Sequence, residues 1–276
     1  MLIDSHHHLW QYSKEQYPWI GPEMSVLARD FWVEELRSLA DENRMDGFVT
    51  VQARQSLAET EVLLALAEDE PLIKGVVGWL DLRSPELPAQ LDRFGSAAKL
   101  KGVRHVVQDE PELDFILGDA FQQGVGQLSQ YDLAYDILIF AKQLPAATKF
   151  AAAHPNLRLI VDHIAKPTID GPDVDPIYSR LMRELASLPN VTCKFSGVAT
   201  EVVGDWNIDL VRPYWDLMLD AFGPSRLMFG SDWPVCLLKT EYSRWLDVTR
   251  ELTATLSETE QRQFYSETAQ SAYKLQ

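Results

Sequence analysis

The chain contains few cysteines. Cys193 and Cys236 are the two that occur in 276 residues, and they form no spacing motif. This pattern is typical of reduced, buried thiols in a cytoplasmic protein rather than of a disulfide framework. The N-terminus also lacks a basic segment followed by an apolar run, so we expect no secretory signal and a cytoplasmic location.

Positive charge is scarce as well. The chain has 25 lysines and arginines against 41 aspartates and glutamates, which gives a formal net charge of -16. Such a surface repels nucleic acid and anionic membranes, so we expect neither as a partner. No apolar run approaches the length of a membrane span. An anionic ligand would therefore need a local basic pocket.

Glycine-rich phosphate loops are missing too, since neither a GxGxxG nor a GKS/T pattern occurs. An open doubly wound sheet normally carries such a loop after its first strand, where this chain has histidines. No low-complexity segment or linker interrupts the sequence. The length and the 46% hydrophobic content suit one large core. We therefore expect a single domain over residues 1–276.

Short apolar runs alternate with helical patterns along the whole chain. The first run precedes the N-terminal histidines, and the runs are rich in Val, Ile, Leu and Phe, as expected for strands covered on both faces. Eight such units predict an α/β fold, a closed (β/α)8 TIM barrel. The later predicted strands are Phe48–Val51, Ile73–Leu82, Leu100–Val107, Leu133–Phe140, Leu157–His163, Val191–Phe195 and Arg226–Ser231.

Helices are predicted from apolar periodicity and from start signals. Ser56–Glu59 and Ser257–Glu260 read as capping boxes, and Pro213 suits the first turn of a helix that ends at Gly223. The aromatic segment Trp10–Pro22 is too long for a tight connection, so we expect a loop at the mouth of a pocket. Other predicted helices are Val33–Met45, Leu113–Ser129, Pro145–Ala153 and Asp175–Leu188.

The N-terminal run Asp4–His8 is the first candidate for chemistry. Side chains alternate along a strand, so His6 and His8 share a face and His7 points away, which is typical of a structural residue. Two imidazoles in this arrangement bind a metal ion or flank a substrate. Asp232, in a Gly-Ser-Asp-Trp-Pro motif after the last strand, lies beside the first strand when a barrel closes. Such a carboxylate and its imidazoles activate water, with or without a metal.

Polar side chains also follow the other strands, where a barrel enzyme has its active site. Burying so many polar groups for structure alone is costly. The alternative is that Asp81 caps a helix and that Asp136, Asp162 and Lys194 are ion-pair partners. His154 suits a helix C-terminus. Besides these, the strand ends carry Gln52, Arg54, Trp79, Arg104, His105, His163, Lys166, Ser196 and Ser231.

Seven segments together resemble the amidohydrolase superfamily, in particular the amidohydrolase-2 branch that contains sugar lactonases for L-fucono- and L-rhamnono-lactones. A dicarboxylate (pyrone) lactonase is a more distant member of the branch. The resemblance spans nearly the whole chain and implies a barrel of the metallo-dependent hydrolase type. It rests on residues 4–10, 17–19, 75–82, 101–105, 161–167, 193–197 and 229–235.

The resemblance assigns roles to individual residues. The superfamily's catalytic and metal-binding positions fall on His6, His8, His163 and Asp232, which implies one divalent ion, zinc first among the candidates, or none. The superfamily's strand-five histidine or carbamylated lysine has no counterpart beyond Asp136, which puts a two-metal site in doubt. The superfamily's usual Asn-Ala near the C-terminus is replaced here by Thr-Ala, at residues 268–269.

The expected reaction is hydrolysis of a carboxylic ester bond, opening a sugar-acid lactone to the aldonate in sugar catabolism. Asp232 takes a proton from water while the three histidines polarise the carbonyl. Lysine stands at positions 166 and 194, where the dicarboxylate lactonase has arginines, which favours a neutral lactone. The expected substrate-binding residues are Gln52, Arg54, Trp79, Arg104, His105, Lys166, Lys194, Trp10 and Trp206.

Two rivals stay open. A dicarboxylate lactonase or a metal-dependent decarboxylase would use the same barrel, and a sugar-acid binding protein with a decayed site would lack turnover. Retention of all four core positions speaks against the binding protein. The expected partner is a small-molecule sugar lactone, and the sequence leaves the oligomeric state open, a homo-oligomer included.

Overall fold

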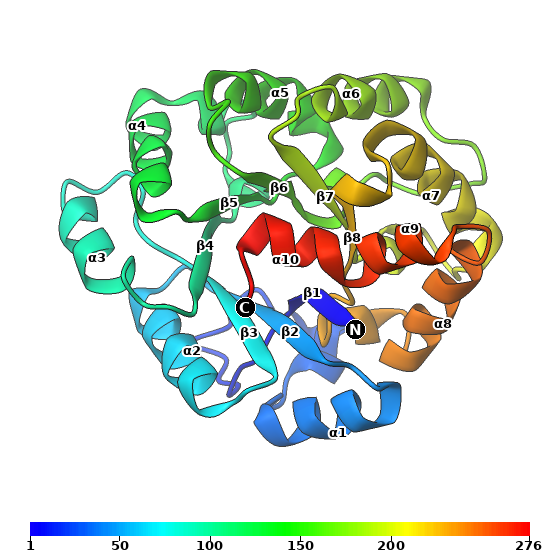
Figure 1. Ribbon diagram of the computed structural model, residues 1–276, viewed down its shortest axis with the longest axis horizontal. Helices are drawn as coiled ribbons and strands as arrows, with labels where there is room; N and C mark the ends of the chain where they lie inside the picture. Colours follow the sequence, from blue (N-terminus) through cyan, green and yellow to red (C-terminus); the bar gives the residue numbers. More distant parts are fainter.

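The computed structural model, which describes residues 1–276, contains one sheet of eight parallel strands in sequential order (Figure 1). The strands are β1 (Ile3–His7), β2 (Gly47–Val51), β3 (Ile73–Gly78), β4 (Leu100–His105), β5 (Ala134–Ile137), β6 (Leu159–Val161), β7 (Val191–Phe195) and β8 (Leu227–Phe229). The first and last strands meet through a parallel bridge between His7 and Trp233. The predicted (β/α)8 barrel is confirmed.

Most of the helices form a ring around the barrel, and the last two lie across one end of it (Figure 1). The helices are α1 (Val33–Asn43), α2 (Leu57–Asp69), α3 (Leu87–Phe94), α4 (Asp119–Gln127), α5 (Leu144–Ala153), α6 (Pro176–Ala186), α7 (Ile208–Phe222), α8 (Tyr242–Leu252), α9 (Glu258–Arg262) and α10 (Thr268–Tyr273). Their inward faces bury one large apolar cluster against the outside of the sheet. None of these helices combines the length and the apolar character needed to cross a bilayer.

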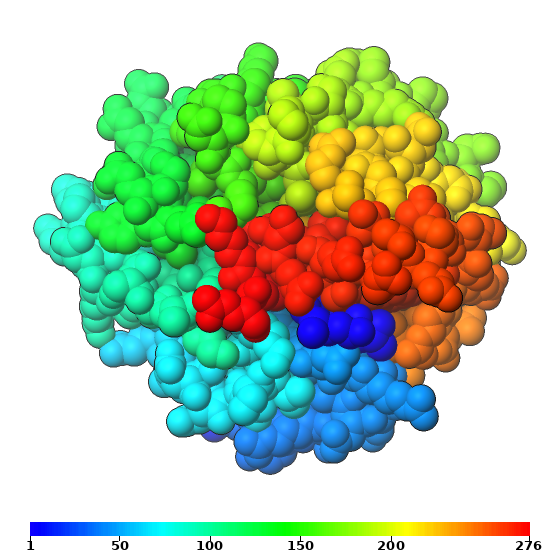
Figure 2. Space-filling view, viewed as in Figure 1, coloured from blue at the N-terminus to red at the C-terminus, as the bar shows by residue number.

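The amino-terminal end of the barrel is covered by the last helix. In Figures 1 and 2, α10 lies across this end, next to the N-terminus. Ala269, Ala272 and Tyr273 pack there against barrel-interior residues that include Ile3 and Ile160. Because this end is filled, a ligand can enter the barrel only from the carboxyl ends of the strands, where barrel enzymes carry their active sites.

Two predicted helices differ from the observed ones. Helix α7 begins at Ile208 rather than near Pro213, because the Asn207 side chain caps it by accepting from the backbone N–H of Asp209 and Leu210 at 2.9 and 3.2 Å. Pro213 lies inside the helix. The predicted helix over 113–129 is divided at Gly118, whose extended backbone separates a short 3-10 turn from α4.

The two predicted capping boxes have different outcomes. The box at Ser257 forms, with Ser257 and Glu260 bonded reciprocally. The box at Ser56 does not, since the Ser56 side chain makes no cap bond. Glu59 turns inward instead and accepts from the backbone N–H of Ala53 and Arg54 at 3.0 and 2.9 Å. It thereby fixes the loop between β2 and α2.

Candidate active site

Barrel closure brings the two ends of the sequence together in one cluster. His6 and His8 lie at the end of β1, and Asp232 follows β8; its backbone N–H donates to the His6 carbonyl at 2.8 Å. His6 Nε2 lies 3.3 Å from His8 Nε2. Asp232 Oδ1 lies 3.7 Å from His6 Nε2 and 3.4 Å from His8 Nε2. All three side chains are buried. The predicted meeting of Asp232 with His6 and His8 is therefore observed.

Hydrogen bonds behind the cluster orient its imidazoles. His8 Nδ1 lies 2.8 Å from the Val51 carbonyl oxygen, which only accepts, so Nδ1 carries the proton and Nε2 keeps its lone pair for the cluster. Burial lowers the pKa of His6 well below its usual value, and the Lys194 charge lowers it further, so His6 is neutral. His7 points away and lies 2.8 Å from Thr50 Oγ1, which fits its expected structural role.

His163 approaches the cluster from β6 on an unusual turn. Residues 163–166 all have positive φ, between 47° and 60°, a conformation that is unfavourable for residues other than glycine. The predicted strand therefore stops at Val161. Nε2 of His163 lies 3.8 Å from Asp232 Oδ1, and Nδ1 lies 2.9 Å from Ser196 Oγ. A Cβ at Gly197 would lie 2.7 Å from Nδ1, so the imidazole needs this glycine.

The charge states of His163 and Asp232 follow from their surroundings. Burial lowers the pKa of His163 to about 4, with smaller contributions from nearby charges of both signs, so the imidazole is neutral at pH 7. Burial alone would raise the pKa of Asp232. The electrostatic influence of the neighbouring histidines, with His163 foremost, outweighs that effect and holds the pKa of Asp232 below its usual range. Asp232 is therefore an ionised acceptor beside neutral imidazoles.

The spacing of the cluster fits a divalent metal ion. Ligand atoms at about 2.0–2.1 Å in a tetrahedral site lie about 3.3–3.4 Å apart. The distances among His6, His8 and Asp232 are 3.3, 3.4 and 3.7 Å, and the three offer two nitrogens and one oxygen. His163 groups instead with His6 and Asp162. Three of the four predicted ligands thus share one candidate site, and His163 stands beside it.

Below the cluster lies a set of buried, paired side chains, here called the lower ion network: Arg104, Asp136, Asp162, Lys194 and Tyr273. Lys194 Nζ lies 2.6 Å from Asp136 Oδ2 and 2.9 Å from Asp162 Oδ1. Arg104 Nη1 lies 2.9 Å from Asp162 Oδ2, and the Tyr273 hydroxyl donates to Asp136 Oδ2 at 2.6 Å. The alternative reading of Asp136, Asp162 and Lys194 as ion-pair partners is confirmed. Lys194 Nζ also contacts His6 Nδ1 at 3.1 Å.

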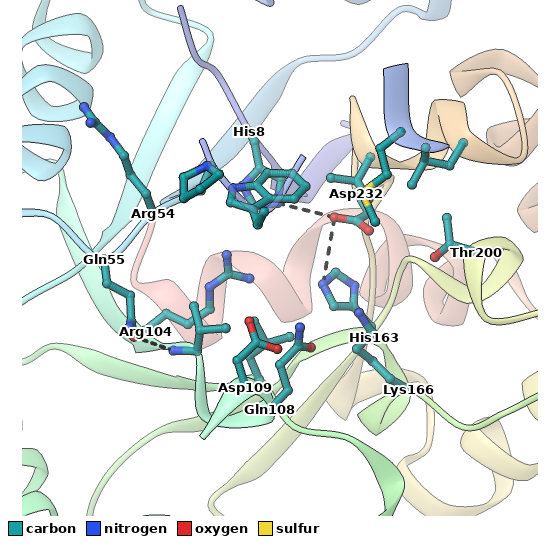
Figure 3. Close-up of a pocket in the computed structure, with 18 of the residues that line it drawn as sticks. His8, Arg54, Gln55, Arg104, Gln108, Asp109, His163, Lys166, Thr200 and Asp232 are labelled. Carbon is teal, nitrogen blue, oxygen red and sulfur yellow. Dashed lines mark hydrogen bonds and ion pairs between the residues drawn. The ribbon is translucent and has the colours of Figure 1, made fainter. Parts of the chain in front are cut away.

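A cavity of about 920 Å³ opens above the cluster (Figure 3). His8, His163 and Asp232 line it, and its basic lining residues are Arg54, Arg104 and Lys166. Each basic group already faces a carboxylate: Arg104 pairs with Asp162, Lys166 lies 3.4 Å from Glu201, and Arg54 lies 3.7 Å from Glu59. Acidic lining residues outnumber the basic ones, and they are Glu15, Asp109, Glu110, Glu201 and Asp232.

Several predicted substrate-binding residues lie outside the cavity lining. Lys194 is fully buried in the lower ion network. His105 is also buried and bonds to Glu110. Trp10 packs under the first loop with its indole N–H bonded to the Arg29 carbonyl. The remaining three also lie away from the lining: Gln52 against Arg104, Trp79 against Thr60, and Trp206 in a separate small groove beside Lys239.

Other lining residues were not predicted from the sequence. The first loop does reach the mouth of the cavity as expected, and it contributes Trp19 rather than Trp10. Gln108, Asp109 and Glu110 line a second wall, and Glu201 a third. These residues lie several positions beyond their strand ends, so a search restricted to strand ends missed them. The runs of acidic and amide side chains there were the available signal.

The profile of the amidohydrolase family matches residues 3–275. The chain belongs to the amidohydrolase family. The resemblance found in the sequence is thereby confirmed.

Two lactonases are among the proteins to which the chain is similar. The chain is 42% identical to an L-fucono-1,5-lactonase of Burkholderia multivorans, with 100% of this chain and 96% of the relative covered. It is 35% identical to an L-fucono-1,5-lactonase of Burkholderia ambifaria, over 88% of this chain and 85% of the relative. A crystal structure of an amidohydrolase from Burkholderia multivorans with bound zinc superimposes with a TM-score of 0.94, at 40% identity and full coverage of both chains.

Proposed function

We propose that the protein hydrolyses a neutral sugar-acid lactone, of the L-fucono- or L-rhamnono-lactone kind, to the open aldonate. The observation that carries the proposal is the ionised Asp232 beside three imidazoles at the floor of an open cavity. Similarity to two L-fucono-1,5-lactonases supports the substrate class. The two buried, unpaired cysteines fit the expected cytoplasmic location.

The charge of the cavity supports a neutral substrate over a dicarboxylate. Binding two carboxylates requires unpaired cations, ideally guanidinium groups. Here Arg54, Arg104 and Lys166 each face a protein carboxylate, and five acidic side chains share the lining. A second negative group would therefore be repelled, whereas hydroxyl groups find acceptors. No comparable observation favours the decarboxylase alternative.

Each catalytic side chain has a role that its surroundings allow. Asp232 accepts a proton from the water whose oxygen attacks the lactone carbonyl carbon. If the Ser196 hydroxyl donates to His163 Nδ1, then Nε2 carries a proton and donates it in a hydrogen bond to the developing oxyanion. When the ring C–O bond breaks, the protonated Asp232 returns its proton to the leaving ring oxygen, and the new carboxylic acid ionises to solvent.

A divalent ion fits the same floor. His6, His8 and Asp232 would hold it, and zinc is the first candidate because a structural relative binds it. Bound there, the ion would supply Lewis-acid polarisation of the carbonyl and a lower pKa for water. Without it, the protonated Nε2 of His163 is the imidazole donor to the carbonyl oxygen. The lower ion network keeps His6 in place in either case.

The test is acid release from a panel of neutral lactones in a weakly buffered pH indicator, corrected for spontaneous hydrolysis. The panel contains L-fucono-, L-rhamnono- and D-galactono-lactones, each measured before and after chelation with bound metal quantified. We expect turnover of at least one of the L-sugar lactones. A rate equal to the blank for every lactone, with zinc restored, contradicts the proposed function.

A further inference from the structure

One wall of the cavity carries three consecutive acceptor side chains. Gln108, Asp109 and Glu110, here called the acceptor wall, follow β4 and line the cavity. Figure 3 shows Gln108 and Asp109 on the same side of the cavity as His163. Gln108 Oε1 is buried without a hydrogen-bond partner. The Asp109 carboxylate and Glu110 Oε2 form no hydrogen bond within the chain. The only oxygen of these two carboxylates that is bonded is Glu110 Oε1. The wall thus carries unused acceptors, and among them Glu110 Oε2 and the carboxylate of the exposed Asp109 are open to the cavity.

The backbone of this wall is held from three directions. The Gln108 N–H donates to the Leu138 carbonyl at 3.0 Å. The Gln143 side-chain amide donates to the Val107 carbonyl at 2.9 Å, and the Val106 N–H donates to Gln55 Oε1 at 2.9 Å. Gln55 belongs to the neighbouring loop of the cavity. Side chains carried on a backbone fixed in this way are preorganised for a ligand.

Glu110 is held by a further contact. His105 Nε2 lies 2.6 Å from Glu110 Oε1, and the imidazole stacks on Phe115 with an interplanar angle of 14°. Phe121 meets the same ring edge-on. These two aromatic contacts hold the imidazole in place. The imidazole in turn holds one carboxylate oxygen of Glu110 and leaves the other free. His105, which the sequence suggested as a direct contact, bonds to Glu110 and does not line the cavity.

Arg104 gives an independent sign of a ligand next to the wall. Its side chain is 4% exposed and lines the cavity, and its Nε has no partner although both terminal nitrogens are bonded. Leaving a buried guanidinium N–H unpaired is unfavourable unless a ligand accepts from it. A residue that lines the cavity therefore carries one unused donor, in addition to the unused acceptors of the wall, and Trp19 also lines the cavity.

Sugar hydroxyl groups match this arrangement. Each hydroxyl donates one hydrogen bond and accepts others, and bonds donated to carboxylates are among the stronger ones. We propose that Gln108, Asp109 and Glu110 recognise adjacent ring hydroxyls of the lactone and determine specificity for a polyhydroxylated substrate, with His105 as the positioning residue of Glu110. This inference rests on the proposed lactonase function and deepens it.

The test compares two neutral six-membered lactones. L-Fucono-1,5-lactone carries ring hydroxyls, and δ-valerolactone carries none. For each variant the readout is the ratio of kcat/KM for the sugar lactone to that for δ-valerolactone. We expect Asp109→Asn and Glu110→Gln each to lower this ratio about 10- to 100-fold, because a hydrogen bond to a charged acceptor is lost. An unchanged ratio in both variants overturns the inference.

Two exposed residues of the same loop provide matched controls. Glu112→Gln and Asp114→Asn make the same chemical changes outside the cavity, so we expect the ratio to stay at the wild-type value. A drop in the controls as large as in the wall variants would also contradict the inference. Melting temperatures identify any variant that fails to fold, and Asp109→Asn, at an exposed residue, carries the test if Glu110→Gln does not fold.

A positioning role for His105 predicts non-additivity. His105→Phe keeps the aromatic stack and removes the contact with Glu110, so we expect a fall in the ratio like that of Glu110→Gln. The double variant should fall no further than either single one. Fully additive effects contradict the positioning role. Turnover of sugar lactones by the wild type with unchanged ratios in the variants rejects only this inference, whereas no turnover of any sugar lactone rejects the proposed function as well.

Discussion

The barrel interior holds two layers of charge that are built in opposite ways. In the lower ion network every charged group has an opposite partner within 2.9 Å, and none is open to the cavity except Arg104. In the layer above, Asp232 and the acceptor wall present oxygen atoms without cationic partners of their own. The lower layer fixes the geometry of the site. The oxygen atoms without cationic partners in the upper layer contact the ligand. Buried charge alone does not identify a binding residue.

The largest effect is expected in the upper layer. Asp232→Asn removes the proton acceptor, so we expect kcat on the preferred lactone to fall about 10³- to 10⁴-fold. The melting temperature should change little by comparison. Asp205→Asn, at an exposed residue, is the matched control and should retain wild-type kcat. More than a tenth of the rate remaining in Asp232→Asn would contradict the role of this carboxylate.

A substitution in the lower layer should act on stability. Lys194→Met leaves the buried carboxylates of Asp136 and Asp162 without their shared cation, which costs about 3–5 kcal/mol. We expect a large fall in melting temperature, measured by circular dichroism. Adding Asp136→Asn should recover part of it, because one uncompensated charge is removed. If Lys194→Met instead raised KM and left the melting temperature unchanged, Lys194 would belong to the substrate site.

The buried carboxyl group of Glu59, which holds the loop between β2 and α2, tests the effect of burial through the pH dependence of stability. Burial raises the pKa of Glu59 from 4.5 to about 7, although backbone hydrogen bonds and Arg54 oppose the shift. Between these values the unfolded chain has lost the proton and the folded chain keeps it, so folding stability falls as pH rises from 4.5 through 7. Glu59→Gln removes this loss.

The Glu59 variant should therefore gain stability over wild type as pH rises from 5 to 8, by up to about 3 kcal/mol. Melting temperatures of both proteins across this range measure the difference. Glu68→Gln, exposed on the same helix, should show no such trend. A difference between Glu59→Gln and wild type that is independent of pH contradicts the raised pKa of this buried carboxyl group.

The smallest effect concerns a cation of the upper layer. Lys166 is partly exposed and lies 3.4 Å from Glu201, so its contribution to binding is screened. We expect Lys166→Met to raise KM for the sugar lactone about 3- to 10-fold. Lys149→Met, on the exposed face of α5, should leave KM unchanged. A loss of several hundredfold would mean that Lys166 binds a charged group of the substrate.

The fold followed from the sequence because one repeating pattern specifies it. Eight apolar strands alternating with helices admit few closed arrangements. Closure then implies that Asp232 meets His6 and His8, although more than two hundred residues separate them. The start of α7 was missed because the cap at Asn207 is stronger than the signal of Pro213. The Ser56 box failed because Glu59 bonds to a loop, a tertiary choice that local spacing does not encode.

Side-chain roles were harder to predict than positions. Polar residues at strand ends alternate between the cavity and the interior, and periodicity does not say which carboxylate will neutralise Lys194. The tryptophans show the same limit. Trp10 and Trp19 belong to one loop, yet the first is 1% exposed under it and the second lines the cavity. Such choices are made by packing between distant segments.

The central claim is that this cavity serves a neutral, hydroxylated lactone. The most direct measurement compares initial rates of the wild-type protein on L-fucono-1,5-lactone and on 2-pyrone-4,6-dicarboxylate under identical conditions. The paired cations and the excess of acidic lining residues predict turnover of the sugar lactone and no turnover of the dicarboxylate. Faster turnover of the dicarboxylate would contradict the account.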